Sequence, residues 1–179
     1  MRIRKATCAD LPAMMELFRR AREFMAQTGN PHQWGDRAWP PRSLLEADIS
    51  EGHSYVAEWD GVVVATFYYR YGRDIEPTYA RIEQGEWQDD SPYGVIHRIA
   101  SDRSRHGIGT YCIQWAYRQC RHLRIDTHRD NAVMRHLLEK LGFRQCGIIY
   151  VGEDSMPRIA YEKSQRIEGS QENGAEEIV

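Results

Sequence analysis

The chain has 179 residues, of which 41% are hydrophobic and 28% are charged, and its formal net charge is −2. This composition is typical of one globular domain with a sizeable core, and the near-neutral charge argues against a nucleic-acid partner. No run approaches the roughly 20 consecutive apolar residues of a membrane span, and the first ten residues lack the apolar stretch of a signal peptide, so we expect a cytoplasmic protein without membrane contact.

The first third of the chain predicts a strand, two helices and a hairpin. Residues 2–6 are expected to form a short strand, and apolar residues at helical spacing then follow Asp10, which suits a helix N-cap, until Gly29. A shorter helix is expected over residues 42–52. Two β-rich runs then flank the pair Asp60-Gly61, which favours a tight hairpin turn with positive φ.

The remainder predicts an alternation of strands and helices after a long polar loop over residues 71–92. Such a loop is more often functional than idle. The elements expected after it are a strand over 94–100, a helix presenting Cys112, Trp115, Ala116 and Cys120 on one face, a strand over 123–127, a helix from Asn131 to Gly142, and antiparallel strands over 143–151 and 158–163. The pattern indicates an α/β fold with a mixed sheet covered by helices.

The cysteines and the last residues set further limits. Cys8, Cys112, Cys120 and Cys146 lie far apart without a Cys-x-x-Cys pair, so they indicate neither a metal site nor a disulfide framework, and we expect reduced cysteines packed as small hydrophobes. Residues 164–179 hold four glutamates and few apolar side chains, which is typical of a disordered tail.

Two glycines, Gly107 and Gly109, open the helix that follows the strand over 94–100. Bare backbone at a helix N-terminus favours an anion such as a phosphate, because free N–H groups and the helix dipole meet there. The side chains that add to such a site are Arg103, Arg105, His106 and the Thr110 hydroxyl. A Walker loop requires a lysine that is missing after Gly109, and a dinucleotide fingerprint requires a third glycine where Cys112 stands.

These motifs, in this order, resemble those of the GCN5-related N-acetyltransferases. "SRHGIG" is similar to the family's Arg/Gln-x-x-Gly-x-Gly/Ala motif, with Ser104 in place of arginine or glutamine. "RIDTHRDNAVMRHLLEKLGF" and "RIRKATCADLPAMMEL" are similar to its later strand and helix and to its first strand and helix. The resemblance spans residues 1–163 and implies one domain with a mixed, mostly antiparallel, twisted sheet of six to seven strands, helices on both faces and splayed central strands.

The resemblance implies an N-acetyltransferase that moves the acetyl group of acetyl-CoA to a primary amine of a small molecule, an amino acid or a protein. The amine attacks directly in a ternary complex, without a metal, and the protein is a monomer or a homodimer. The implied cofactor contacts are Ile99, Ala100, Arg103, Ser104, Arg105, His106, Gly107, Ile108, Gly109, Thr110 and Asn131.

The family's usual acid, a tyrosine, is replaced by Leu138. His97 and His128 are the candidate catalytic residues, since an imidazole titrates near neutral pH; deprotonation through ordered water is the alternative. The candidate substrate-binding residues are Trp34, Trp39, Trp87 and Asp126. The replacements at Leu138 and Ser104 leave open a coenzyme A-binding or sensing module with little catalysis. Nucleic-acid binding through the arginine-rich helices is disfavoured, because the body of the chain is near neutral.

Overall fold

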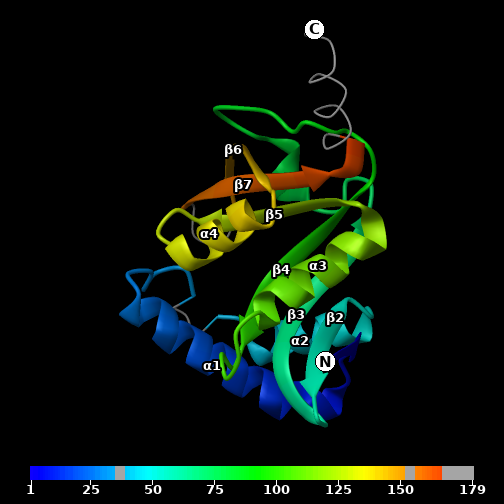
Figure 1. The fold of residues 1–179 in the computed structure, drawn as a ribbon, viewed down its shortest axis with the longest axis vertical. Coiled ribbons are helices and arrows are strands. Elements are labelled where there is room, and N and C mark those ends of the chain that lie inside the picture. Colours follow the sequence, from blue (N-terminus) through cyan, green and yellow to red (C-terminus); the bar gives the residue numbers. More distant parts are fainter. Residues whose placement is uncertain (35–38, 152–155, 167–179) are drawn as a thin grey trace, which may run out of the picture. The chain divides into compact units, whose positions relative to one another are not determined.

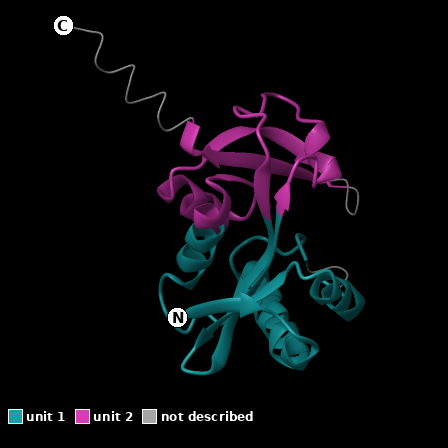
Figure 2. Cartoon of the chain, turned by 90° about the vertical axis from the view of Figure 1, so that its right-hand side faces the viewer, with its two compact units in different colours: residues 1–70, 96–116 teal, residues 71–95, 117–179 magenta. Residues whose placement is uncertain are grey.

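The structure is a computed structural model that describes residues 1–34, 39–151 and 156–166. The described chain divides into two compact units (Figure 2). Unit 1 comprises Met1–Arg70 and Ile96–Ala116, and unit 2 comprises Tyr71–Val95 and the chain from Tyr117 onward. The expected single domain over residues 1–163 stays a prediction, and most of the expected tail, residues 167–179, lies outside the described residues.

In the described part of the chain, seven strands form one mixed sheet in the order β1-β2-β3-β4-β5-β7-β6 (Figure 1). The strands are β1 Arg2–Lys5, β2 Ser54–Trp59, β3 Val62–Gly72, β4 Tyr93–Ser101, β5 His122–His128, β6 Arg144–Tyr150 and β7 Pro157–Ser164. The helices are α1 Leu11–Gln27, α2 Arg42–Ser50, α3 Ile108–Cys120 and α4 Ala132–Lys140, with 3-10 turns at Cys8–Asp10 and Pro77–Ala80. The sheet is mostly antiparallel, as expected, and β4 and β5 are a parallel pair.

In unit 1, helices cover both faces of the sheet. Tyr55 of β2 contacts Trp115 of α3, with ring centroids 5.0 Å apart. The next residue, Val56, belongs to the core cluster that contains Phe18 of α1 and Leu45 of α2. Adjacent residues of a strand point to opposite faces of a sheet, so α3 lies on one face and α1 and α2 lie on the other.

The hairpin predicted at Asp60-Gly61 is confirmed. β2 and β3 pair antiparallel, and Asp60 and Gly61 have φ values of 49° and 78°, the positive values that this kind of turn requires. Asp10 occupies the predicted N-cap position of α1, but the prediction that its side chain caps the helix is wrong. Its carboxylate does not cap α1 and instead accepts hydrogen bonds from Thr7 N–H (2.8 Å) and from the Arg4 guanidinium.

The two central strands pair over a short stretch. The parallel ladder between β4 and β5 joins Gly94 to Leu123 and Val95 to Arg124, in line with the expected splayed strands. Beyond the ladder, Arg98 of β4 has φ of 51°, a left-handed value that is rare for a residue with a side chain. The second half of β4 therefore departs from regular strand geometry.

In unit 2, β5 pairs with β7 and β7 with β6, both antiparallel. The predicted cap of α4 is confirmed, because Asn131 Oδ1 accepts a hydrogen bond from Met134 N–H at 3.1 Å. Gly142, with φ of 79°, follows the last turn of the helix. Leu138 is fully buried. No helix within the described ranges is long and apolar enough to cross a membrane.

Candidate functional site

The turn between β4 and α3, residues 102–107, belongs to unit 1 and has a specific shape. Asp102 N–H donates to Val64 O of β3 at 2.9 Å, which fixes the start of the turn. Asp102 Oδ1 accepts hydrogen bonds from Ser104 N–H (3.0 Å) and from Ser104 Oγ (2.8 Å). Arg103 and Gly107 have φ values of 60° and 88°. Two left-handed residues thus reverse the chain before the helix begins.

Backbone N–H groups gather at the start of α3. Tyr111 N–H donates to Gly107 O at 2.9 Å, so the amides of Ile108, Gly109 and Thr110 precede the hydrogen-bond ladder of the helix. A Cβ placed on Gly107 would meet no heavy atom of the described residues within 4 Å, so this side of the turn is open. An anion can approach such a backbone closely, and the helix dipole favours it.

Two arginines of the turn lie over aromatic rings. The guanidinium carbon of Arg103 is 3.2 Å from the ring centroid of Phe24 in α1. The same atom of Arg105 is 4.2 Å from the ring centroid of Trp59 in β2. These cation–π contacts hold two exposed positive charges beside the turn. Arginine is well suited to phosphate, because its planar group offers several donors at once.

The structure places the other predicted cofactor contacts on two elements. Ile99 is half-buried and Ala100 is buried in the second half of β4, with the Ala100 side chain in the core of unit 1. The turn and these residues are contiguous, so unit 1 brings them together. Asn131 belongs to unit 2, where its side chain caps α4.

The two histidine candidates differ in their surroundings. His97 in β4 is half-buried, and its ring centroid is 5.9 Å from that of Tyr68 in β3. His128, the last residue of β5, is 1% exposed, and its Nδ1 accepts a hydrogen bond from Asp130 N–H at 3.2 Å. His97 lies in unit 1 and His128 in unit 2.

Trp34 and Trp39, predicted to bind substrate, both contact α1. The Trp34 ring packs edge-on against Phe18 with centroids 5.7 Å apart, and it rests on the core of unit 1. Trp39 O accepts a hydrogen bond from Arg22 Nη1 at 2.9 Å. Both tryptophans are thus anchored on one helix.

Trp87 and Asp126, the other two substrate candidates, meet at Tyr79 in unit 2. Trp87 Nε1 donates to Tyr79 O at 2.9 Å, and the Tyr79 hydroxyl donates to Asp126 Oδ1 at 2.8 Å. Burial raises the pKa of Tyr79 well above its ordinary value, and the Asp126 charge adds to the shift. The Tyr79 hydroxyl therefore stays protonated, and its hydrogen bond holds the Asp126 carboxylate in place.

Sequence reasoning missed a buried cation of unit 2, Arg124. The guanidinium carbon of Arg124 is 4.2 Å from the Trp87 ring centroid and 4.1 Å from that of Tyr93. Its Nε donates to Glu162 Oε1 at 2.9 Å and its Nη2 to Asp89 O at 2.6 Å. The ring of Trp87 thus contacts a cation of the chain itself. Polar residues occupy every second position of residues 122–128, a pattern that predicts a strand with one polar face in water and therefore gave no sign that Arg124 is buried.

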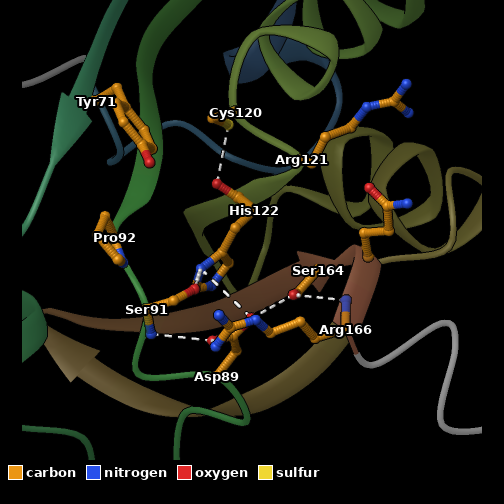
Figure 3. Close-up of a pocket in the computed structure, with 10 residues that line it drawn as sticks. Tyr71, Asp89, Ser91, Pro92, Cys120, Arg121, His122, Ser164 and Arg166 are labelled. Carbon is orange, nitrogen blue, oxygen red and sulfur yellow. Dashed lines mark hydrogen bonds and ion pairs between the residues drawn. The ribbon is translucent and has the colours of Figure 1, made fainter.

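A hollow of about 480 Å³ lies at the start of β5 in unit 2 (Figure 3). Its polar groups satisfy one another: His122 Nδ1 lies 3.1 Å from Ser91 Oγ, and Asp89 accepts hydrogen bonds from Ser91 N–H and from the Ser164 hydroxyl. Burial alone raises the pKa of Asp89, but these hydrogen bonds outweigh it and lower the pKa to about 2. Four residues of the lining, Asp89, Ser91, His122 and Ser164, thus form one structural network.

Thiols and acidic or imidazole groups form no metal site in the part of the chain that the structure describes. None of the four cysteines forms a disulfide. The expectation that they pack as small hydrophobes is wrong for Cys8, which is exposed, and holds for Cys112 and Cys146, which are buried. Burial raises the pKa of Cys112 and Cys146 to about 12, so neither is a thiolate near neutral pH.

Known structures share this fold. A GNAT-family acetyltransferase from Streptococcus agalactiae is 30% identical with a TM-score of 0.83, over 92% of this chain and 95% of that one. A GNAT-family acetyltransferase from Listeria monocytogenes is 18% identical with a TM-score of 0.65, over 90% and 93%. A ribosomal-protein-alanine N-acetyltransferase from Brucella melitensis is 23% identical with a TM-score of 0.56, over 92% and 99%.

A search of curated proteins finds no match. The family model described as "Acetyltransferase (GNAT) family" matches residues 11–143, which extend from the start of α1 to the residue before β6. The match includes the turn before α3 and the segment of β5 and α4 on which the sequence resemblance rested. The chain therefore belongs to the GNAT acetyltransferase family, and its activity is acetyl transfer.

Proposed function

We propose that this protein transfers the acetyl group of acetyl-CoA to a primary amine, carried by a small molecule, an amino acid or a protein, by direct attack in a ternary complex. The observation that carries the proposal is the turn before α3. Its open Gly107, its amides at the helix start and its two ring-stacked arginines fit a diphosphate.

In this proposal the cofactor lies along unit 1. The amides of residues 105–110 hold the diphosphate of coenzyme A, and Arg103, Ser104 and Arg105 contribute side chains. The backbone of Ile99 and Ala100 contacts the pantetheine arm, since these residues lie beyond the ladder that joins β4 to β5. Asn131 at the start of α4 is the remaining cofactor contact.

Proton transfer in the reaction has two requirements. The acceptor ammonium must lose a proton before its nitrogen attacks the thioester carbon, and the departing thiolate of coenzyme A must gain one. Leu138, at the position of the family's tyrosine, has no proton to give and is buried. We assign the base to His97, whose half-buried ring lies on β4 close to the proposed pantetheine contacts. His128 is the second candidate, and burial limits its access to solvent.

Each unit holds its own candidate acceptor contacts, on loops in unit 1 and on a loop and β5 in unit 2. Trp34 and Trp39 lie on the α1 side of unit 1, and Trp87 and Asp126 surround Tyr79 in unit 2. Asp126 supplies the negative charge that attracts an ammonium group. The proposal specifies the acceptor by one chemical group, a primary amine.

Thiol release tests the proposal. The protein is incubated with acetyl-CoA and a panel of amino acids, polyamines and peptides with free N-termini, and free thiol is followed by a thiol-reactive dye. We expect thiol to appear in proportion to an amine acetylated at nitrogen, as identified by mass spectrometry. Tight binding of coenzyme A without thiol release across the panel contradicts the proposal and favours a coenzyme A-binding module. Release without any amine present indicates hydrolysis instead.

A further inference from the structure

The irregular geometry of β4 is concentrated at one residue. Arg98 has φ of 51° in the middle of a strand, and it is not a glycine. An L-residue in this conformation brings its Cβ too close to its own backbone, so neighbouring interactions must hold it there. The contacts of Arg98 in unit 1 identify those interactions.

The left-handed residue changes where two side chains point. The His97 ring centroid lies 5.9 Å from that of Tyr68, and the Arg98 guanidinium carbon lies 4.7 Å from the same centroid. Successive residues of a regular strand point to opposite faces of the sheet. Here both reach the one ring, so the kink at Arg98 turns His97 and Arg98 toward the same face of the sheet.

An ion pair with α2 holds the kink. Arg98 Nη2 donates to Asp48 Oδ2 at 2.7 Å, and the side chains of Asp48 and Arg98 are 8% and 16% exposed. Burial raises the pKa of Asp48, and the adjacent Arg98 opposes this rise. The Asp48 backbone is itself anchored, because His53 N–H donates to Asp48 O at 2.9 Å and Tyr69 N–H donates to His53 O at 2.9 Å. The carboxylate therefore sits at a fixed position relative to β3.

A buried ion pair of this kind adds little net stability, because removing both charges from water opposes their attraction. Its effect is to select one arrangement of the groups around it. We propose that Asp48 is a positioning residue for acetyl transfer, which acts by holding Arg98 and thereby fixing the kink that orients His97 and the backbone of Ile99 and Ala100. The inference rests on the proposed function, which assigns the base to His97 and the pantetheine contacts to the residues after the kink.

The first experiment compares two matched ion pairs of unit 1. Asp10 and Arg4 are also joined at 2.7 Å, and the Asp10 side chain is 9% exposed, close to the value for Asp48. Asp48→Asn and Asp10→Asn each remove one buried carboxylate. We expect both variants to lose thermal stability, but only Asp48→Asn to lower kcat at saturating substrates, by about tenfold or more, because a small misplacement at the reacting centre is costly. Equal kcat values for the two variants overturn the proposal.

The second experiment separates the kink from the arginine side chain. Glycine adopts φ of 51° without strain, whereas alanine does not. In the Asp48→Ala background, we therefore expect the added change Arg98→Gly to restore part of kcat and the added change Arg98→Ala to restore none. Equal kcat values for the glycine and alanine double variants overturn the proposal, because they show that the conformation at residue 98 does not control the reaction.

Coenzyme A affinity, measured by calorimetry, distinguishes this inference from the proposed function. A wild-type protein that binds no coenzyme A and releases no thiol overturns both. A wild-type protein that does both, together with an Asp48→Asn variant that retains wild-type kcat, overturns only the role of Asp48. The expected result for Asp48→Asn is a loss of kcat that exceeds the loss of coenzyme A affinity, since the diphosphate turn is held independently by Asp102.

Discussion

Substitution of Gly107 tests the diphosphate turn most directly. Its φ of 88° lies in the left-handed region, so Gly107→Ala strains the folded backbone by about 1–2 kcal/mol wherever the Cβ points. In a protein of this size, 1 kcal/mol corresponds to a fall in Tm of about 2–4 °C. The Cβ enters open space, with no heavy atom of the described residues within 4 Å, so no steric clash within the protein adds to this cost.

Gly29, in the same unit, is the matched control. Its φ is 86°, and a Cβ at this position also meets no heavy atom of the described residues within 4 Å. Gly29→Ala and Gly107→Ala are therefore expected to lower Tm by similar amounts. Only the latter places a methyl group where we assign the diphosphate, so we expect its coenzyme A affinity to fall by about tenfold, or about 1.4 kcal/mol. Gly107→Val, with a branched side chain, is expected to bind more weakly still.

The assay is calorimetric titration with coenzyme A, beside a thermal melt of each variant without ligand. Strain and affinity are thus measured separately. If Gly107→Ala binds coenzyme A as tightly as Gly29→Ala while both melt at the same lowered temperature, the methyl group meets no phosphate, and the diphosphate site lies elsewhere.

Three further predictions concern other residues. His97→Ala is expected to lower kcat more than coenzyme A affinity; equal losses in steady-state and calorimetric data would reduce His97 to a structural role. Glu162→Gln leaves Arg124 and His122 buried without their carboxylate and is expected to cost about 3 kcal/mol in urea unfolding, so an unchanged midpoint contradicts this network. Hydrogen bonds from the Arg4 guanidinium lower the pKa of Asp10 from 3.8 to about 2. This shift contributes about 2 kcal/mol to the free energy of unfolding above pH 4, and the contribution is lost as pH falls toward 2. The Asp10→Asn variant is expected not to show this loss in thermal melts at acid pH.

Local chemistry explains why much of the fold was predictable. A positive φ at Asp60-Gly61 depends on those two residues, and the hydrogen bond from Met134 to Asn131 spans three positions. The open turn at Gly107 is equally local, since a glycine after a strand and before a helix leaves few alternatives. Features of this kind depend on residues that are close together along the chain, so the sequence alone predicts them.

Partners on other secondary-structure elements explain the misses. Asp10 stands at the predicted helix boundary, but its carboxylate pairs with Arg4 of a strand. Trp87 lies in the long loop and is predicted to bind substrate, but its ring contacts Arg124, which follows 37 positions later in strand β5. No residue close to Arg98 in the sequence predicts the kink, because an arginine rarely adopts a left-handed conformation without contacts from other elements. In each case the deciding contact comes from an element whose position the sequence does not reveal.

The replacement of the family's tyrosine by Leu138 connects the fold to the proposed chemistry. Leu138 has no exposed surface, so α4 uses this position for packing in unit 2, and the proton for the leaving thiolate must come from another group or from water. An enzyme without that acid depends more heavily on holding the amine and the thioester at the right distance and orientation for reaction. Unit 1 contains two contacts suited to this, because Asp48 holds the Arg98 side chain of β4 and Asp102 holds the turn that follows the strand. We therefore expect positioning, rather than acid catalysis by a tyrosine of α4, to account for most of the acceleration by this protein.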